Sequence, residues 1–103
     1  MLSLASKIKV ATIKLEDLGE EFDLVVYALP GAIDHMFVLA SPFDKDEAVL
    51  ELKSGDIVTG KLKPSVHFLA CEWLGKHRKW LKSALLNASS NKKPETFLVN
   101  SAA

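Results

Sequence analysis

Three histidines and one cysteine carry the side chains with the most chemical potential in this sequence. His77 stands between Trp73 and Trp80 in the stretch CEWLGKHRKWL, and helical spacing would place all three side chains on one face. Such a histidine could be a catalyst, a metal ligand or a core residue. We favour a core residue hydrogen-bonded to a backbone carbonyl or a carboxylate, because an unpaired buried polar group costs about 1–3 kcal/mol.

His35 lies in a strand-like segment, residues 32–40, where alternation groups it with Ile33, Phe37 and Leu39. That grouping predicts that His35 is buried too. If His35 and His77 both point into the seam between sheet and helix, they could act as general acid and base. A small enzyme acting on RNA, with His35 and His77 as its catalytic residues, is therefore one alternative function.

His67 and Cys71 are spaced four residues apart on the flank of the predicted helix. That spacing allows two side chains to bind one metal ion, but no nearby histidine or aspartate cluster completes a coordination set. Cys71 and His67 could also be a nucleophile and its base, although a lone cysteine on a helix flank is more often a small apolar residue. We expect neither a metal nor a cofactor.

The strongest structural pattern is a helix predicted from about residue 66 to 87, with Ser65 as its N-cap after Pro64. At 100° per residue, one arc is apolar apart from a histidine and the opposite arc is polar. The apolar arc contains Val66, Leu69, Ala70, Trp73, Leu74, His77, Trp80, Leu81, Ala84, Leu85 and Ala88. The polar arc contains Glu72, Gly75, Lys76, Arg78, Lys79, Lys82 and Ser83, and Phe68 and Leu86 fall on this side.

Upstream of the helix, five segments have strand character, within residues 7–15, 22–29, 32–40, 48–52 and 56–62. The first alternates with Ile8, Val10 and Thr12 on one face, and the last two form a hairpin with Gly55 in its turn. Residues 16–21 and the pair Pro30-Gly31 predict turns. The fold class is therefore α+β, an antiparallel sheet of about five strands covered by one long C-terminal amphipathic helix.

The length of 103 residues fits a single compact domain, with its core at about residues 7–88. Residues 89–103 then form a tail or an edge segment. One cysteine excludes an internal disulfide, and no segment has the pattern of a signal peptide or a membrane span, so we expect a cytoplasmic protein.

Charge is unevenly distributed, although the formal net charge is zero. Residues 15–56 hold eleven acids against two lysines, whereas residues 57–93 hold eight basic residues against Glu72. The basic helix face of Lys76, Arg78, Lys79 and Lys82 could contact phosphates, so a nucleic-acid binder is a further alternative. The zero net charge weakens that alternative, and no exposed aromatic platform accompanies the basic residues.

Residues 47–85 resemble a small bacterial family, domain-of-unknown-function family 4160, whose members often lie beside a small partner gene in toxin–antitoxin-type pairs. The resemblance rests on a strand with EAV, a glycine-bounded hairpin ending in GKL and proline, and a helix carrying EW and HR before a leucine. The matching residues are Glu47-Ala48-Val49, Gly55, Gly60-Lys61-Leu62, Pro64, Glu72-Trp73, His77-Arg78 and Leu81. It implies a compact sheet-plus-helix domain that works with a protein partner.

The function that we favour is a non-enzymatic protein-interaction module. One component of a toxin–antitoxin-type pair is an example of such a module. Its supports are the split charge, the resemblance, and Phe68 and Leu86 on the polar side of the helix. We expect a protein partner or a homodimer, in which the acidic strand region of one chain faces the basic helix of the other. We expect no membrane association.

Overall fold

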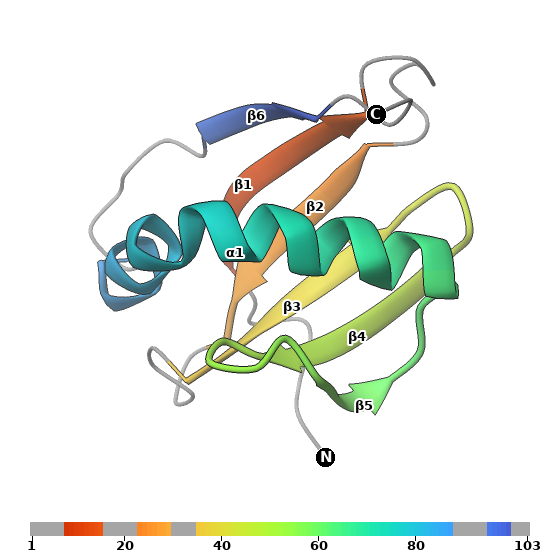
Figure 1. The fold of residues 1–103 in the computed structure, drawn as a ribbon, viewed down its shortest axis with the longest axis horizontal. Coiled ribbons are helices and arrows are strands. Elements are labelled where there is room, and N and C mark those ends of the chain that lie inside the picture. Colours follow the sequence, from red (N-terminus) through yellow and green to blue (C-terminus); the bar gives the residue numbers. More distant parts are fainter. Residues whose placement is uncertain (1–7, 16–22, 30–34, 88–94, 100–103) are drawn as a thin grey trace.

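The computed structural model describes residues 8–15, 23–29, 35–87 and 95–99. The chain forms six strands and one helix in the order β1 (Ile8–Leu15), β2 (Leu24–Ala28), β3 (Met36–Ser41), β4 (Asp46–Glu51), β5 (Ile57–Gly60), α1 (Pro64–Leu86) and β6 (Glu95–Val99). Helix α1 lies across one face of the sheet (Figure 1). The predicted turns at residues 16–21 and 30–31 lie outside the described residues.

The strands form one sheet in the order β5-β4-β3-β2-β1-β6. Every neighbouring pair is antiparallel except β1 and β6, which pair in parallel. The α+β class is therefore confirmed, but the prediction of a purely antiparallel sheet with a C-terminal helix is wrong. The chain after α1 adds β6 beside β1. Short turns join antiparallel neighbours, whereas a long connection that includes a helix allows a strand to pair in parallel.

The core lies between α1 and the sheet, and the predicted apolar arc is confirmed from Val66 to Leu85, while Ala88 lies outside the described residues. Val66, Ala70, Trp73, Leu74, Leu81 and Leu85 are buried, while Leu69, His77, Trp80 and Ala84 are half-buried. They pack on alternate strand residues, among which Val26, Phe37, Leu39 and Leu50 are almost completely buried. A smaller apolar cluster of Leu29, Val38 and Val49 lies apart from this core.

The alternation predicted for β1 is interrupted by a bulge. The pairing of β1 with β2 shifts register between Lys9 and Ala11, and Val10, Ala11 and Ile13 are all buried. Thr12, predicted on the face of Val10, is instead half-exposed. An extra residue in one strand reverses the direction of every side chain after it, so the alternation fails at the bulge.

Helix α1 begins at Pro64, two residues earlier than predicted. Lys63 occupies the N-cap position without a side-chain cap, and Pro64 stands in the first turn, so Ser65 is not the N-cap. Proline suits this place because the first helical N–H groups lack partners in any case. The Lys63 ammonium donates to the Asp44 carboxylate at 2.7 Å, which links the helix start to the β3–β4 turn and lowers the pKa of Asp44. Among the described residues, no helix is long and apolar enough to cross a membrane.

Gly60 at the end of β5 provides a stability prediction with a matched control. Its φ is +84°, and a Cβ there would collide with the Glu47 carbonyl oxygen, whereas a Cβ at Gly75 would meet nothing within 4 Å. We expect Gly60→Ala to lower the free energy of unfolding by about 2 kcal/mol or more. Gly75→Ala should raise it by about 0.5–1 kcal/mol. Urea denaturation of both variants checks this, and equal effects would contradict the assigned backbone conformation.

Candidate functional site

His77 is part of an aromatic cluster between α1 and β6, formed by Trp73, His77, Trp80 and Phe97. The His77 ring stacks on Trp73 at 5.3 Å between ring centroids and lies 4.7 Å from Phe97. Phe97 also meets the rings of Trp73 and Trp80 edge-on, at 5.3 and 4.8 Å. The strand segment near the C-terminus therefore supplies the ring at the centre of this cluster.

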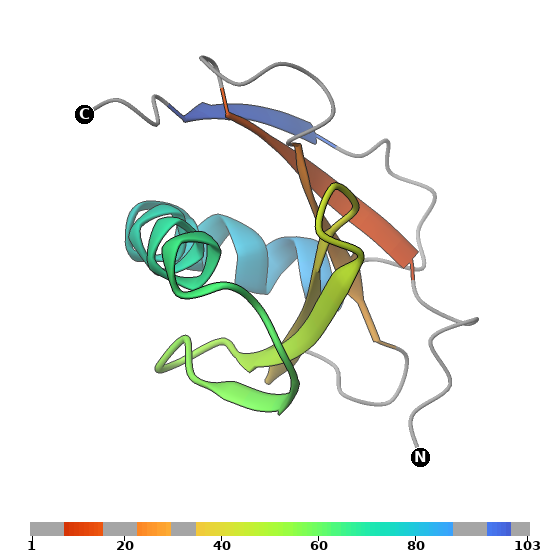
Figure 2. The ribbon, with the colours of Figure 1, turned by 90° about the vertical axis from the view of Figure 1, so that its right-hand side faces the viewer.

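The imidazole of His77 donates from Nδ1 to the Trp73 carbonyl oxygen at 3.0 Å. The predicted hydrogen bond to a backbone carbonyl is present, although the side chain is half-buried rather than mostly buried. The backbone of His77 is non-helical, with φ −125° and ψ 16°, and the helix bends there. Figure 2 looks along the first part of α1 and shows its last turns from the side. A side chain that enters the helical hydrogen-bond ladder is a common cause of such a bend.

Trp73 should be the main anchor of the aromatic cluster, because it is 3% exposed and contacts three other rings. We expect Trp73→Ala to reduce stability by about 3–5 kcal/mol. Trp73→Phe should cost much less, since it keeps a ring and removes an indole Nε1 that is buried and has no hydrogen-bond partner among the described residues. Thermal denaturation compares the two; a parent-like melting temperature for Trp73→Ala would refute this packing.

Replacement of His77 separates its structural role from a catalytic one. We expect His77→Ala to lower stability by about 1–2 kcal/mol, because it removes the ring contacts and the bond to the Trp73 carbonyl. His77→Phe, which keeps a ring but not the bond, should lose less. Melting temperatures of both variants provide the measurement. If His77→Ala kept the parent's melting temperature and lost its biological effect, a functional role would replace the structural one.

A second set of helix side chains holds the turn between β4 and β5, and we call His67, Cys71 and Arg78 the turn clasp. His67 Nε2 donates to the Gly55 carbonyl oxygen at 2.8 Å, and the Cys71 thiol points to the same oxygen at 3.7 Å. Arg78 Nε donates to the Leu52 carbonyl oxygen at 3.1 Å. The donors to the Gly55 and Leu52 carbonyl oxygens therefore all come from one side of α1.

Glycine at position 55 allows this close approach. Its φ is +79°, a backbone conformation that residues with a Cβ rarely adopt. A Cβ there would also lie 3.0 Å from Cys71 Sγ. His67 and Cys71 thus face a carbonyl oxygen, which is a hydrogen-bond acceptor. Among the described residues, no group of three or more His, Cys, Asp or Glu side chains is placed to hold a metal ion.

Burial raises the pKa of the Cys71 thiol above its ordinary value of 9.0, and the nearby Asp56 carboxylate adds to the effect. Because of the raised pKa, the Cys71 thiol stays protonated at neutral pH. This disfavours a nucleophilic role, since the thiolate is the reactive form. His67 points at the Gly55 carbonyl and not at the thiol in the hydrogen bonds formed here. The geometry favours the small apolar role for Cys71.

The raised pKa of Cys71 predicts a pH dependence of stability. The folded chain binds the thiol proton more tightly than the unfolded chain, so this contribution is complete below pH 9 and is lost as pH rises through the folded pKa. We therefore expect the parent to lose stability relative to Cys71→Ala over the alkaline range, as the pH rises above the ordinary thiol pKa of 9.0. Urea denaturation across this range measures the difference, and parallel pH profiles would contradict the assigned environment.

His35 lies outside the core, so the prediction that it is buried is wrong. It is exposed and precedes the first residue of β3, where its carbonyl oxygen accepts a bond from the Leu52 N–H. Strand alternation still aligns it with Phe37, but it precedes β3 and its side chain is exposed. The alternation pattern alone does not reveal where a strand leaves the core.

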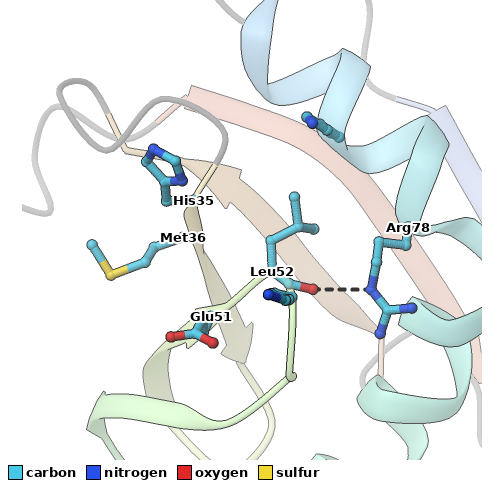
Figure 3. A pocket seen from close by; sticks show the side chains of 7 residues that line it. His35, Met36, Glu51, Leu52 and Arg78 are labelled. Atoms are coloured by element: carbon cyan, nitrogen blue, oxygen red, sulfur yellow. Dashed lines mark hydrogen bonds between the residues drawn. The ribbon is translucent and has the colours of Figure 1, made fainter.

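His35 instead lines a pocket of about 610 Å³ at the edge of the helix–sheet seam. The lining residues are His35, Met36, Glu51, Leu52, Lys53, Arg78 and Lys82. Figure 3 shows His35 and Met36 on one side, Arg78 on the other and Leu52 between them. We call this hollow the cationic pocket.

The structure does not bring His35 and His77 into one cluster. His77 packs against Phe97 of β6, which is three strands away from β3 in the sheet, or roughly 14 Å at the usual strand spacing. Paired acid–base catalysis needs both groups within hydrogen-bond reach of one substrate. The catalytic roles of His35 and His77 stay a prediction.

The predicted basic face divides into two parts. Arg78 and Lys82 line the cationic pocket, while Lys76 and Lys79 lie exposed elsewhere on the helix. Phe68, the remaining predicted binding residue, is 64% exposed. Sequence reasoning missed Met36, Leu52 and Lys53 as pocket residues, because the end of β4 meets the helix only in three dimensions.

Comparisons with known proteins add no relative. No family model matches the chain, and neither a curated protein nor a solved structure matches it. The resemblance to domain-of-unknown-function family 4160 stays a prediction.

Proposed function

We propose that the protein is a small protein-interaction module that binds its partner through the outer face of α1. This outer face consists of Phe68, Glu72, Gly75, Lys76, Lys79 and Leu86, all exposed. The observation that carries the proposal is the exposure of two large apolar side chains on it, Phe68 at 64% and Leu86 at 54%. Water contact with large apolar surface is unfavourable, and such surface often marks a binding site.

Gly75 supports the same surface. An exposed glycine inside a helix costs about 1 kcal/mol relative to alanine. This chain does not require a glycine there, since a Cβ at Gly75 would meet nothing within 4 Å. A partner backbone that approaches the helix closely would account for the missing side chain, and the neighbouring Lys76 and Lys79 would favour an acidic partner surface.

The resemblance to the toxin–antitoxin-associated family suggests the kind of partner, the other component of such a pair. A second copy of this chain is the other candidate. The acidic side chains Glu47 and Glu51, which share one face of β4, would then face the basic helix of the partner copy. Opposite charges of this kind steer association and make it sensitive to salt.

Two exposed apolar residues provide a matched test of the interacting surface. We expect Phe68→Ser to abolish capture of the partner from cell lysate, because it removes the largest exposed apolar side chain of the outer face. Val58→Ser is the control, since Val58 is 54% exposed but lies on β5. Captured proteins and nucleic acids are identified separately, and light scattering at low and high salt measures self-association.

The proposal requires one protein, or a second copy of the chain, to bind the parent and Val58→Ser but not Phe68→Ser. Equal capture by all three chains would show that the outer face is not the interface. Capture of nucleic acid alone, at every salt concentration tested, would favour the nucleic-acid alternative instead.

A further inference from the structure

We propose that the cationic pocket binds a small organic phosphate, a phosphate monoester attached to an apolar or aromatic body. This site is separate from the outer face of α1 and does not depend on the proposed protein partner. It is formed by the start of β3, the end of β4 and the second half of the helix (Figure 3). A cation held in place by a hydrogen bond, an apolar wall and a suitable volume favour this class of ligand.

Arg78 is the best positioned cation. Its Nε is bonded to the Leu52 carbonyl oxygen, which fixes the plane of the guanidinium group and leaves its terminal nitrogens for a ligand. No carboxylate among the described residues pairs with Arg78 or with Lys53 across the pocket. An arginine held in this way suits an anion with several oxygens, because its planar donors can bind two oxygens at once.

The remaining charged groups strengthen the positive field. Lys82 follows Arg78 by one helical turn, so both side chains line the same hollow. Among the described residues that line the pocket, the one carboxylate is that of Glu51; it accepts a hydrogen bond from Ser54 Oγ at 3.0 Å, and Figure 3 shows it directed away from Arg78. Among the described lining residues the cations Lys53, Arg78 and Lys82 outnumber the carboxylates, and a hollow surface concentrates such a field on an anion.

The pocket also has an apolar part, which a bare inorganic ion would not use. Leu52 is buried and Met36 is half-buried, and both line the hollow. A volume of about 610 Å³ falls in the range of small-molecule sites, roughly 300–1,000 Å³. A phosphate monoester carries up to two negative charges and three acceptor oxygens at neutral pH, so it matches these cations better than a single carboxylate does.

A titration with phenyl phosphate, followed by amide chemical shifts in NMR, tests the site. We expect saturable shifts at Leu52, Lys53, Arg78 and Lys82, with weaker binding of inorganic phosphate, benzoate and phenol. Lys82→Gln should raise the Kd of phenyl phosphate roughly tenfold, the loss expected for a hydrogen bond to a charged group. Lys61→Gln removes an exposed lysine away from the pocket and should leave the Kd unchanged.

Three outcomes would overturn the proposal. Phenol binding as tightly as phenyl phosphate would show an apolar hollow without anion recognition. Benzoate binding more tightly would assign the site to carboxylates. Equal weakening by Lys82→Gln and Lys61→Gln would show nonspecific charge attraction. Because Arg78→Gln also breaks the turn clasp, Lys82→Gln is the deciding variant, and its melting temperature establishes that it is folded.

Discussion

The packing of α1 on one face of the sheet is the contact on which the other features of this protein depend. The helix buries Trp73, Leu74 and Leu81 against strand residues such as Phe37 and Leu50. Each such side chain contributes roughly 1.5–3 kcal/mol when it is removed from water. The same contact fixes which helix residues face the β4–β5 turn, which face β6 and which face solvent.

Two sets of polar and aromatic contacts then determine the position of the helix. Apolar burial is nondirectional, whereas hydrogen bonds require particular distances and angles. The turn clasp connects α1 to the carbonyl oxygens of Gly55 and Leu52, and the aromatic cluster connects it to β6. The bend at His77 falls within the aromatic cluster, one residue before Arg78 of the clasp. Because Arg78 belongs to the clasp, the contact that positions the helix also forms one wall of the cationic pocket.

Local pattern was enough to predict the helix and which of its faces is buried, because both follow from a single period of about 3.6 residues. It was not enough for the pairing of β6 with β1, which joins Ala11 to Glu95 across most of the chain. The bulge in β1 and the exposure of His35 at the end of a strand also depend on tertiary contacts. The pocket joins residues 35–36, 51–53, 78 and 82. The sequence pattern related Arg78 to Lys82 on one helix face, but it related neither of them to the two strand segments.

The most direct test of this account is the tautomer of each neutral imidazole, measured by long-range proton–nitrogen NMR. A carbonyl oxygen only accepts hydrogen bonds, so the nitrogen that points to it must carry the proton. The account predicts that His67 is protonated at Nε2, facing Gly55, and that His77 is protonated at Nδ1, facing Trp73. The same tautomer in both residues would contradict either the turn clasp or the hydrogen bond at the helix bend.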